Sequence, residues 1–165
     1  MQQDQITGYS EKLQIEKRYV TVTTKETLLE MVEAIEEASR ISLDTETTSL
    51  NPRKGKIIGF SITTKIGTGF YLPTLKWNNY TQKLEELLIE GKSTHNIAVR
   101  VMKMLKGKKL ICHNASFDLR YIKNYYGVSL IEDLWVDTAL LVHTVQEEGA
   151  GMGVFGLKPL AVSIQ

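Results

Sequence analysis

The fold is organised around Ile41-Ser42-Leu43-Asp44-Thr45-Glu46-Thr47-Thr48-Ser49-Leu50, an apolar run that ends in two carboxylates one residue apart. Successive side chains of a strand point to opposite faces, so Asp44 and Glu46 share a face. Neighbouring carboxylates repel each other unless a cation lies between them, and their oxygens suit Mg²⁺ or Mn²⁺. The stretch predicts a core strand that leads into a metal site, although Asp-x-Glu also occurs by chance on solvated turns.

A second stretch of the same kind lies downstream, at Leu110-Ile111-Cys112-His113-Asn114-Ala115-Ser116-Phe117-Asp118. It runs from a short apolar strand into polar residues, and Asp118 can supply a third carboxylate from a different element. The alternative interpretation is a helix start with Asn114 or Ser116 as N-cap. The two interpretations are compatible, because a helix N-terminus favours carboxylates and phosphates.

In order and surroundings, the two stretches resemble the DEDD (DnaQ-like) 3′–5′ exonucleases. Residues 44–50 resemble the first exonuclease motif and residues 114–118 the second. The likeness is closest to the proofreading domain of DNA polymerase I-type (family A) polymerases, which have further stretches like Tyr19-Val20-Thr21, Trp135 to Leu141 and Gly156 to Ala161. The resemblance implies an α/β, ribonuclease H-like fold with a mixed sheet flanked by helices.

The resemblance also implies a role for each site residue. The residue that matches Asp44 bridges two cations, Mg²⁺ or Mn²⁺. The match to Glu46 holds the cation that activates water, and the match to Asp118 supports the second cation. The predicted contacts with the 3′ end of single-stranded DNA are Thr45, Thr47, Leu50, His113, Asn114 and Phe117. Core packing explains Leu50 and Phe117 equally well, and a lone His beside a motif is more often structural.

The sequence departs from the family pattern at the third motif, in which a Tyr or His is followed four residues later by Asp. The only aspartates after Asp118 are Asp133 and Asp137, and the residues four positions before them are Ser129 and Asp133 itself. Asp137 is interpreted instead as the N-cap of a following helix. The sequence thus predicts a domain that is incomplete at its C-terminus, with little activity as it stands, from a truncated, proteolysed or split protein.

Composition bounds the remaining possibilities. A chain of 165 residues, 42% apolar and 24% charged, fits one globular domain. The net charge of +1 means that any nucleic-acid binding must come from a local patch. The single Cys112 excludes an internal disulfide and fits a reducing compartment. No apolar run approaches about 18 residues and no signal peptide is recognisable, so we expect a cytoplasmic protein with no membrane contact.

The pattern along the chain predicts a flexible lead-in over residues 1–16 and the exonuclease domain over residues 17–165. Predicted strands are 19–23, 41–44, 56–64, 69–72, 108–112 and 130–135, of which the second to fourth form one meander with a turn at residues 65–67. Predicted helices are 24–39, capped by Thr23 or Thr24, and 79–90, 94–105, 116–126, 137–145 and 157–164, with a Gly-rich loop at 147–154. The glutamates of the first helix are interpreted as a solvated face.

Three functions remain open from the sequence. The first is a proofreading exonuclease, with a polymerase domain downstream or on a separate chain. The second is a non-catalytic module that binds single strands or a partner protein. The third is an exoribonuclease similar to RNase D. The polymerase-like residues 19–23 favour DNA, whereas no residue can be assigned to recognition of the RNA 2′-hydroxyl.

Overall fold

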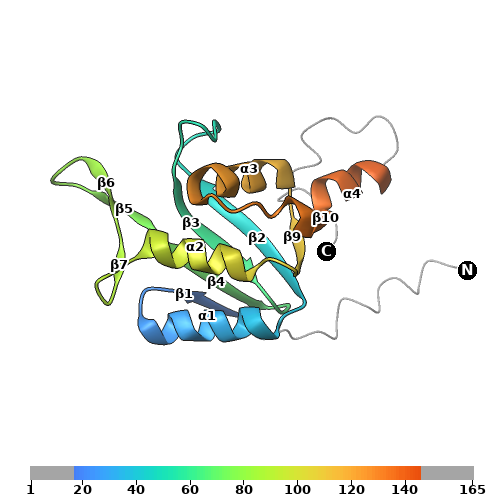
Figure 1. Cartoon of the computed structure of the whole chain (residues 1–165), viewed down its shortest axis with the longest axis horizontal. Helices are drawn as coiled ribbons and strands as arrows, with labels where there is room; N and C mark the ends of the chain where they lie inside the picture. Colours follow the sequence, from blue (N-terminus) through green and yellow to red (C-terminus); the bar gives the residue numbers. More distant parts are fainter. Residues whose placement is uncertain (1–16, 146–165) are drawn as a thin grey trace, which may run out of the picture.

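The computed structural model describes residues 17–145, which form a mixed sheet with helices packed on it (Figure 1). The sheet has six strands in the order β1-β4-β3-β2-β9-β10. Their bounds are β1 (Arg18–Thr21), β4 (Thr68–Pro73), β3 (Ile57–Thr63), β2 (Arg40–Thr47), β9 (Lys109–Cys112) and β10 (Leu134–Asp137). The helices are α1 (Lys25–Glu37), α2 (Thr94–Met104), α3 (Ala115–Tyr126) and α4 (Thr138–Val145). The predicted α/β class is confirmed.

The two motifs lie on neighbouring inner strands of this sheet. Strands β2, β3 and β4 are antiparallel neighbours, which confirms the predicted meander, and β2 pairs in parallel with β9 on its other side. The outer pairs, β1 with β4 and β9 with β10, are also parallel. Strand β2 therefore lies at the centre, and the second motif begins where the adjacent β9 ends.

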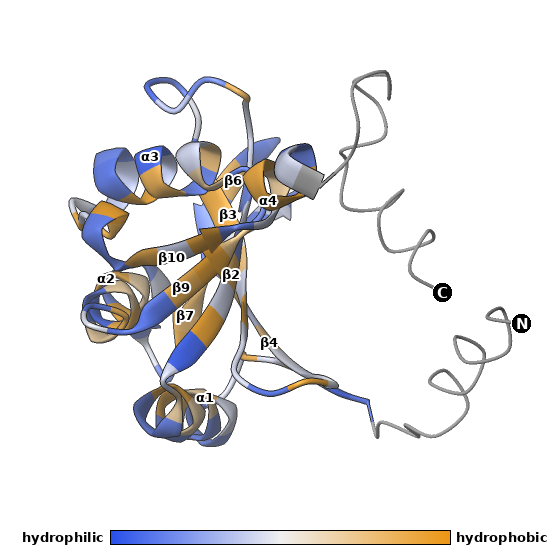
Figure 2. Cartoon of the chain, turned by 90° about the vertical axis from the view of Figure 1, so that its right-hand side faces the viewer, coloured by the Kyte–Doolittle hydropathy of each residue, from blue (hydrophilic) through white to orange (hydrophobic). Residues whose placement is uncertain are grey.

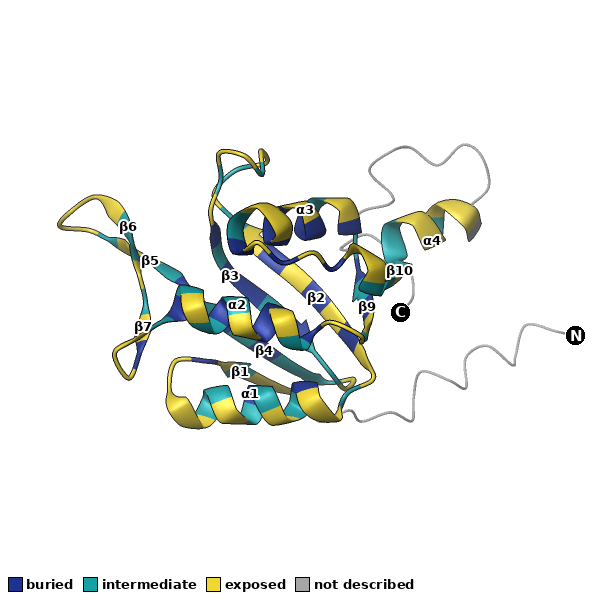
Figure 3. Ribbon diagram, viewed as in Figure 1, coloured by how far each residue is buried: buried dark blue, intermediate teal, exposed yellow. Residues whose placement is uncertain are grey.

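Strand β2 shows why one face of the sheet is covered and the other is open. Ile41, Leu43 and Thr45 are buried, whereas Asp44 and Glu46 are exposed, so the strand alternates along its length (Figure 3). In side view α1, α2 and α3 lie on the same side of the sheet (Figure 2). The apolar residues of β2 face this helical layer, and its carboxylates therefore face away from it.

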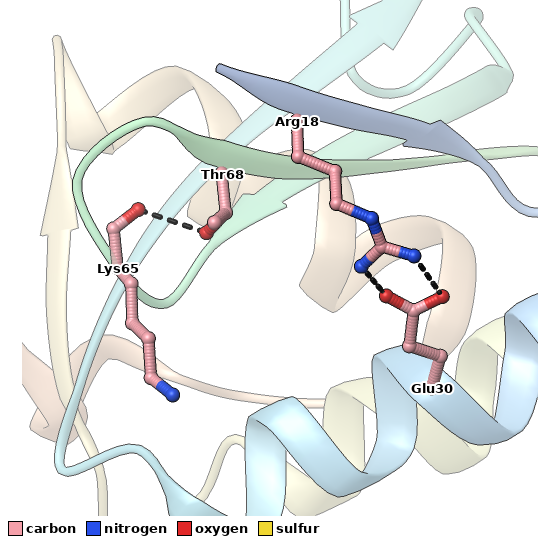
Figure 4. A network of polar contacts seen from close by, with 4 residues as sticks. All are labelled: Arg18, Glu30, Lys65 and Thr68. Atoms are coloured by element: carbon pink, nitrogen blue, oxygen red, sulfur yellow. Dashed lines mark hydrogen bonds and ion pairs between the residues drawn. The ribbon is translucent and has the colours of Figure 1, made fainter. Parts of the chain in front are cut away.

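Helix α1 is held at its start by local hydrogen bonds and along its length by the core. Thr24 is the N-cap and forms a capping box with Thr27, which decides between the two predicted caps. Met31 and Ile35, one turn apart, are fully buried. Glu30, on the helix face that was predicted to be solvated, forms a bidentate ion pair with Arg18 of β1 at the protein surface (Figure 4). The same view shows the Thr68 hydroxyl donating to the Lys65 carbonyl in the predicted hairpin turn.

The helix predicted over residues 79–90 is wrong. This segment forms a hairpin of β5 (Leu75–Asn78) and β6 (Lys83–Glu86), followed by the short pair β7 (Leu88–Ile89) and β8 (Lys92–Ser93). The Asn78 side chain accepts hydrogen bonds from the backbone N–H groups of Tyr80 and Thr81, and Gln82 has φ 52°. The leucine spacing suggested a helix, but an asparagine that bonds the next backbone amides stabilises a turn.

The other described elements differ from prediction mainly at their ends. Helices α2 and α3 are confirmed within a residue or two, and α3 ends at Gly127, whose φ of 70° is typical of a C-terminal glycine. The strand predicted at 130–135 is a 3₁₀ turn (Ile131–Asp133) followed by β10. The predicted lead-in at 1–16, loop at 147–154 and helix at 157–164 lie outside the described residues. No helix within 17–145 is long and apolar enough to cross a bilayer.

Candidate active site

The first motif lies inside a strand rather than after one. Strand β2 was predicted to end at Asp44, but it continues to Thr47, because β3 pairs with it up to that residue. Asp44 and Glu46 therefore project from the same open face, as predicted, with Cα atoms about 7 Å apart at two strand residues. Glu46 is paired with Gly59, over which the ring of Tyr71 lies.

The second motif contacts the first through Asp118. Strand β2 pairs with β9 only as far as Ser42, so the Thr45 N–H has no partner on β9. That N–H donates to Oδ1 of Asp118 at 2.9 Å, and the Thr45 hydroxyl donates to the same oxygen at 2.5 Å. Asp118 is only 2% exposed. Thr45 was predicted to contact substrate. In the structure it lies between Asp44 and Glu46 on β2, and its N–H and hydroxyl hold the Asp118 carboxylate in place.

The carboxylates of Asp44, Asp118 and Asp137 lie near the end of β9, and they raise the pKa of neighbouring groups. Burial raises the pKa of Asp118 to about 6, assisted by Asp44 and opposed by the hydrogen bonds from Thr45. Desolvation also raises the pKa of Asp44, against the opposing effect of His113. The pKa of Cys112 is raised to about 12 by burial and by Asp118, Asp137 and Asp44. A bound cation would relieve this repulsion.

The turn between β9 and α3 is held by a residue that the sequence analysis placed elsewhere. Asn114 stands at the N-cap of α3 in the left-handed conformation (φ 61°) and makes no side-chain cap. Asp137 caps α3 instead: its Oδ1 accepts from Asn114 N at 2.9 Å and its Oδ2 from Ala115 N at 2.8 Å. Its Oδ1 also accepts from Ala139 N at 3.0 Å. Asp137 is therefore the predicted N-cap of α4, and it caps α3 as well.

His113 and Thr138 add a second connection at the same turn. The Thr138 hydroxyl donates to the Cys112 carbonyl at 3.2 Å and lies 2.9 Å from Nδ1 of His113. The tautomer of the His113 ring sets which of the two atoms donates in the second contact. This contact orients the His113 ring, whose electrostatic effect lowers the pKa of Asp44 against the effect of burial.

The loop after the first motif is fastened to α3 by Tyr121, which the sequence analysis missed. The fully buried Tyr121 donates its hydroxyl to the carbonyls of Ser49 and Asn51, the second at 3.2 Å. A Cβ on Gly55 would collide with this hydroxyl, so the close approach requires glycine. The i, i+4 spacing of Phe117 and Tyr121 was the available signal for a shared helix face.

The predicted substrate contacts are divided between exposed and structural positions. Leu50 is 88% exposed at the loop that Tyr121 holds, and Asn114 is exposed at the start of α3. Phe117 is half-buried, packs against the core and lies 5.1 Å from the Tyr121 ring. The Thr47 hydroxyl donates to the Ser49 carbonyl at 3.0 Å, so it shapes the loop.

Carboxylates are the type of ligand that a hard cation prefers, but too few of them lie close together within the described residues to complete a metal site. Within residues 17–145 no three His, Cys, Asp or Glu side chains are close enough together to hold a metal ion. Asp44 and Asp118 interact electrostatically, and both hydrogen bonds from Thr45 go to Oδ1 of Asp118. The described residues therefore supply part of a carboxylate site and leave ligand positions for other groups.

Comparison with known proteins gives the family of the chain. A family model described as 3′–5′ exonuclease matches residues 19–163. The chain belongs to the 3′–5′ exonuclease family. This exonuclease domain is also 33% identical over 110 residues to DNA polymerase I of Borreliella burgdorferi. The match covers 65% of the chain and 11% of the relative, so the chain spans a small part of that polymerase.

Solved structures show the same fold. The exonuclease domain matches the structure of Pol1 from M. smegmatis with a TM-score of 0.60 and 19% identity, covering 88% of this chain and 22% of that one. It matches Escherichia coli RNase D with a TM-score of 0.58 and 18% identity, covering 88% and 32%. At these identities the likeness establishes the ribonuclease H-like fold, and it is nearly equal for the two neighbours.

Proposed function

We propose that the chain is a metal-dependent 3′–5′ exonuclease domain that removes terminal nucleotides from DNA, and that it serves a DNA polymerase I-type enzyme as its proofreading part. The observation that carries the proposal is the link from Thr45 to Asp118. It brings the carboxylate of the second motif to the strand that carries Asp44 and Glu46. Membership of the exonuclease family supports the reaction class.

In this proposal Asp44, Glu46 and Asp118 each supply ligands for a pair of Mg²⁺ or Mn²⁺ ions, and groups from outside residues 17–145 complete the coordination, because no three side chains within that range lie close enough together to hold one ion. A pair of such ions, when bound, lowers the pKa of a water and stabilises the charge that develops on the attacking and leaving oxygens. Asp118 is fixed by Thr45, whereas Asp44 and Glu46 face the open side of the sheet, where a nucleic-acid end can reach them. Exposed Leu50 and Asn114 and half-buried Phe117 then position the terminal nucleotide, with His113 beside Asp44.

The DNA substrate and the polymerase partner rest on the polymerase relatives. The identity to a DNA polymerase I and the structural match to Pol1 favour a polymerase domain in the intact protein or on a separate chain. A second candidate is an exoribonuclease, because RNase D has nearly the same structural similarity as Pol1. Both candidates use the same carboxylates and differ in the nucleic acid that enters.

The test is digestion of 5′-labelled single strands of DNA and of RNA with the same sequence, in Mn²⁺ and then in Mg²⁺. The wild type is compared with Asp44→Ala and with Glu33→Ala, which removes an exposed carboxylate on α1. DNA that shortens from its 3′ end with wild type and Glu33→Ala, but not with Asp44→Ala, supports the proposal. Preferential shortening of RNA supports the exoribonuclease.

The same test is repeated with a longer protein that includes residues downstream of Gln165. Cleavage by the longer protein alone would show that residues downstream of Gln165 complete the ligand set, whereas cleavage by both proteins would show that residues 1–165 supply it. If the longer protein is inert with both metals while Asp44, Glu46 and Asp118 are intact, the exonuclease proposal fails. Single-strand binding that is unchanged by metal and by Asp44→Ala would then favour a non-catalytic binding module.

A further inference from the structure

A basic cavity lies between the loop of the first motif and the helix of the second. It has a volume of about 590 Å³ and is lined by Asn51, Pro52, Arg53, Arg120, Lys123 and Asn124. The first three belong to the β2–β3 loop and the last three to α3, so the two elements that carry the exonuclease motifs form its walls. The cavity is separate from the carboxylates, because Asp118 faces the core and the α3 residues of the cavity face solvent.

The α3 residues that line the cavity lie on one face of that helix. Arg120, Lys123 and Asn124 are spaced i, i+3 and i+4, and all three are exposed. Arg53 is exposed on the opposite wall. A lysine in the last turn of a helix is also expected from the helix dipole, which explains Lys123 by itself. The dipole does not explain Arg120 in the middle of the helix or Arg53 on the loop.

The charge of the cavity is not neutralised by its surroundings. None of the lining residues is acidic. The ion pairs found between described residues are Arg18 with Glu30 and Lys65 with Glu37, so Arg53, Arg120 and Lys123 form none within residues 17–145. Three such cations in one cavity are a marked local concentration for a chain of net charge +1. Such a patch attracts a polyanion even though the whole protein has almost no field.

The loop wall is rigid before any ligand arrives. Tyr121 holds the carbonyl of Asn51 from α3, and Lys54 N and Gly55 N donate to that same carbonyl at 3.0 and 2.9 Å. The Asn51 side chain accepts from Arg53 N at 3.0 Å. The backbone that carries Arg53 is thus fixed by folding, and the entropy cost of ordering it on binding is small.

We infer that this cavity binds backbone phosphates of a single-stranded nucleic acid whose 3′ end lies at the carboxylates. The inference rests on the proposed function and adds the surface that grips the rest of the strand. Arginine forks match phosphate oxygens, and Leu50, 88% exposed, directly precedes Asn51 of the cavity wall. An exposed apolar side chain beside cationic ones suits a strand whose bases are free to contact it, as they are in single strands and not in duplexes.

The experiment measures binding of a fluorescent single-stranded oligonucleotide in EDTA, so that cleavage is not required. Affinity is determined over a series of salt concentrations for wild type, Arg120→Gln/Lys123→Gln and Arg53→Gln. The matched control is Arg100→Gln/Lys103→Gln, which removes the same two residue types at the same spacing from exposed positions on α2. DNA and RNA versions of the oligonucleotide are both used, and circular dichroism checks that every variant is folded.

Removing one cation that contacts a phosphate should make the plot of log K against log salt less steep by about 0.7. By the same relation we expect a decrease of about 1.4 for the α3 double variant and about 0.7 for Arg53→Gln, with several-fold weaker binding at low salt and no change for the α2 control. An unchanged slope in the α3 variant, an equal decrease in the α2 control, or no binding by wild type would overturn the inference. The cleavage assay judges the proposed function separately.

Discussion

Asp118→Asn should stabilise the metal-free protein, because the ionised carboxylate is held in an unfavourable place. Asp118 is 2% exposed, and its pKa is raised from 3.8 to about 6. Asparagine has nearly the same shape, and its side-chain oxygen can still accept from the N–H and hydroxyl of Thr45. The substitution therefore removes the buried charge and keeps both hydrogen bonds.

The magnitude follows from the pKa shift. About two pKa units at about 1.4 kcal/mol per unit give about 3 kcal/mol of destabilisation when the group is ionised in both states. The new amide must also be buried, which costs about 1 kcal/mol if its N–H groups find no partner. We therefore expect Asp118→Asn to raise the free energy of unfolding by about 2 kcal/mol at about pH 7.5.

The sign of the pH dependence is set by the direction of the shift. Because the folded-state pKa of Asp118 lies above its unfolded value, the folded protein binds the extra proton between about pH 6 and pH 4. The destabilisation by Asp118 is complete above about pH 6 and disappears as the pH falls below about 4. The advantage of Asp118→Asn over wild type should decrease across the same interval.

The assay is urea unfolding followed by circular dichroism at about pH 7.5, 5.5 and 4.5 in EDTA, which spans the interval of the shift. Asp118→Ala is the matched control, because it removes the charge and also the acceptor of both Thr45 bonds, so it should be less stable than Asp118→Asn at every pH. A loss of stability in Asp118→Asn that does not vary with pH would refute the reasoning. Adding Mn²⁺ should raise the melting temperature of wild type and not that of Asp118→Asn.

Three further changes test the contacts around the site. Tyr121→Phe removes the hydroxyl that holds the first-motif loop and should cost about 1–2 kcal/mol in urea unfolding, whereas Tyr125→Phe, for which we find no hydroxyl hydrogen bond among the described residues, should cost little. Gly55→Ala should be destabilising because its Cβ collides with that hydroxyl, and combining it with Tyr121→Phe should recover part of the loss; strict additivity in the double variant would contradict the contact. Asp137→Ala leaves three backbone N–H groups without their acceptor and should cost about 2 kcal/mol, with faster hydrogen exchange at Asn114 and Ala115; unchanged exchange there would exclude the capping role.

The error at residues 79–90 shows where local pattern misleads. Leu84, Leu87 and Leu88 have helical spacing, yet Leu88 is 59% exposed and no single face of the segment is buried. A helix gains most of its stability from burying an apolar face, and this segment extends beyond the helical layer with little to cover it (Figure 1). The turn made by Asn78 then decides the outcome, since its side chain satisfies backbone donors that a helix would have used.

Asp137 shows a different limit of prediction from local sequence: its role as a helix cap was predicted, but the helix that it mainly caps was not. Its residue type suggested an N-cap, and it is one, but chiefly for the N-terminus of α3 rather than for the helix that follows it in sequence. Strand β10 pairs with β9 up to Asp137 and Cys112, so the pairing delivers Asp137 to the turn after β9. No local pattern contains that register, because it depends on how two distant strands align.

Local sequence was enough to predict the central strand, the shared face of Asp44 and Glu46, most of the helices and membership of an exonuclease family. These features follow from side-chain periodicity and from motifs of a few residues. Three others depend on the folded chain: Thr45 fixes Asp118, Tyr121 holds the first-motif loop, and Arg53 faces Arg120 and Lys123 across a cavity. Each of these links residues about 70 positions apart in the chain, and no periodicity within a segment can show which distant partners the packing of sheet and helices brings together.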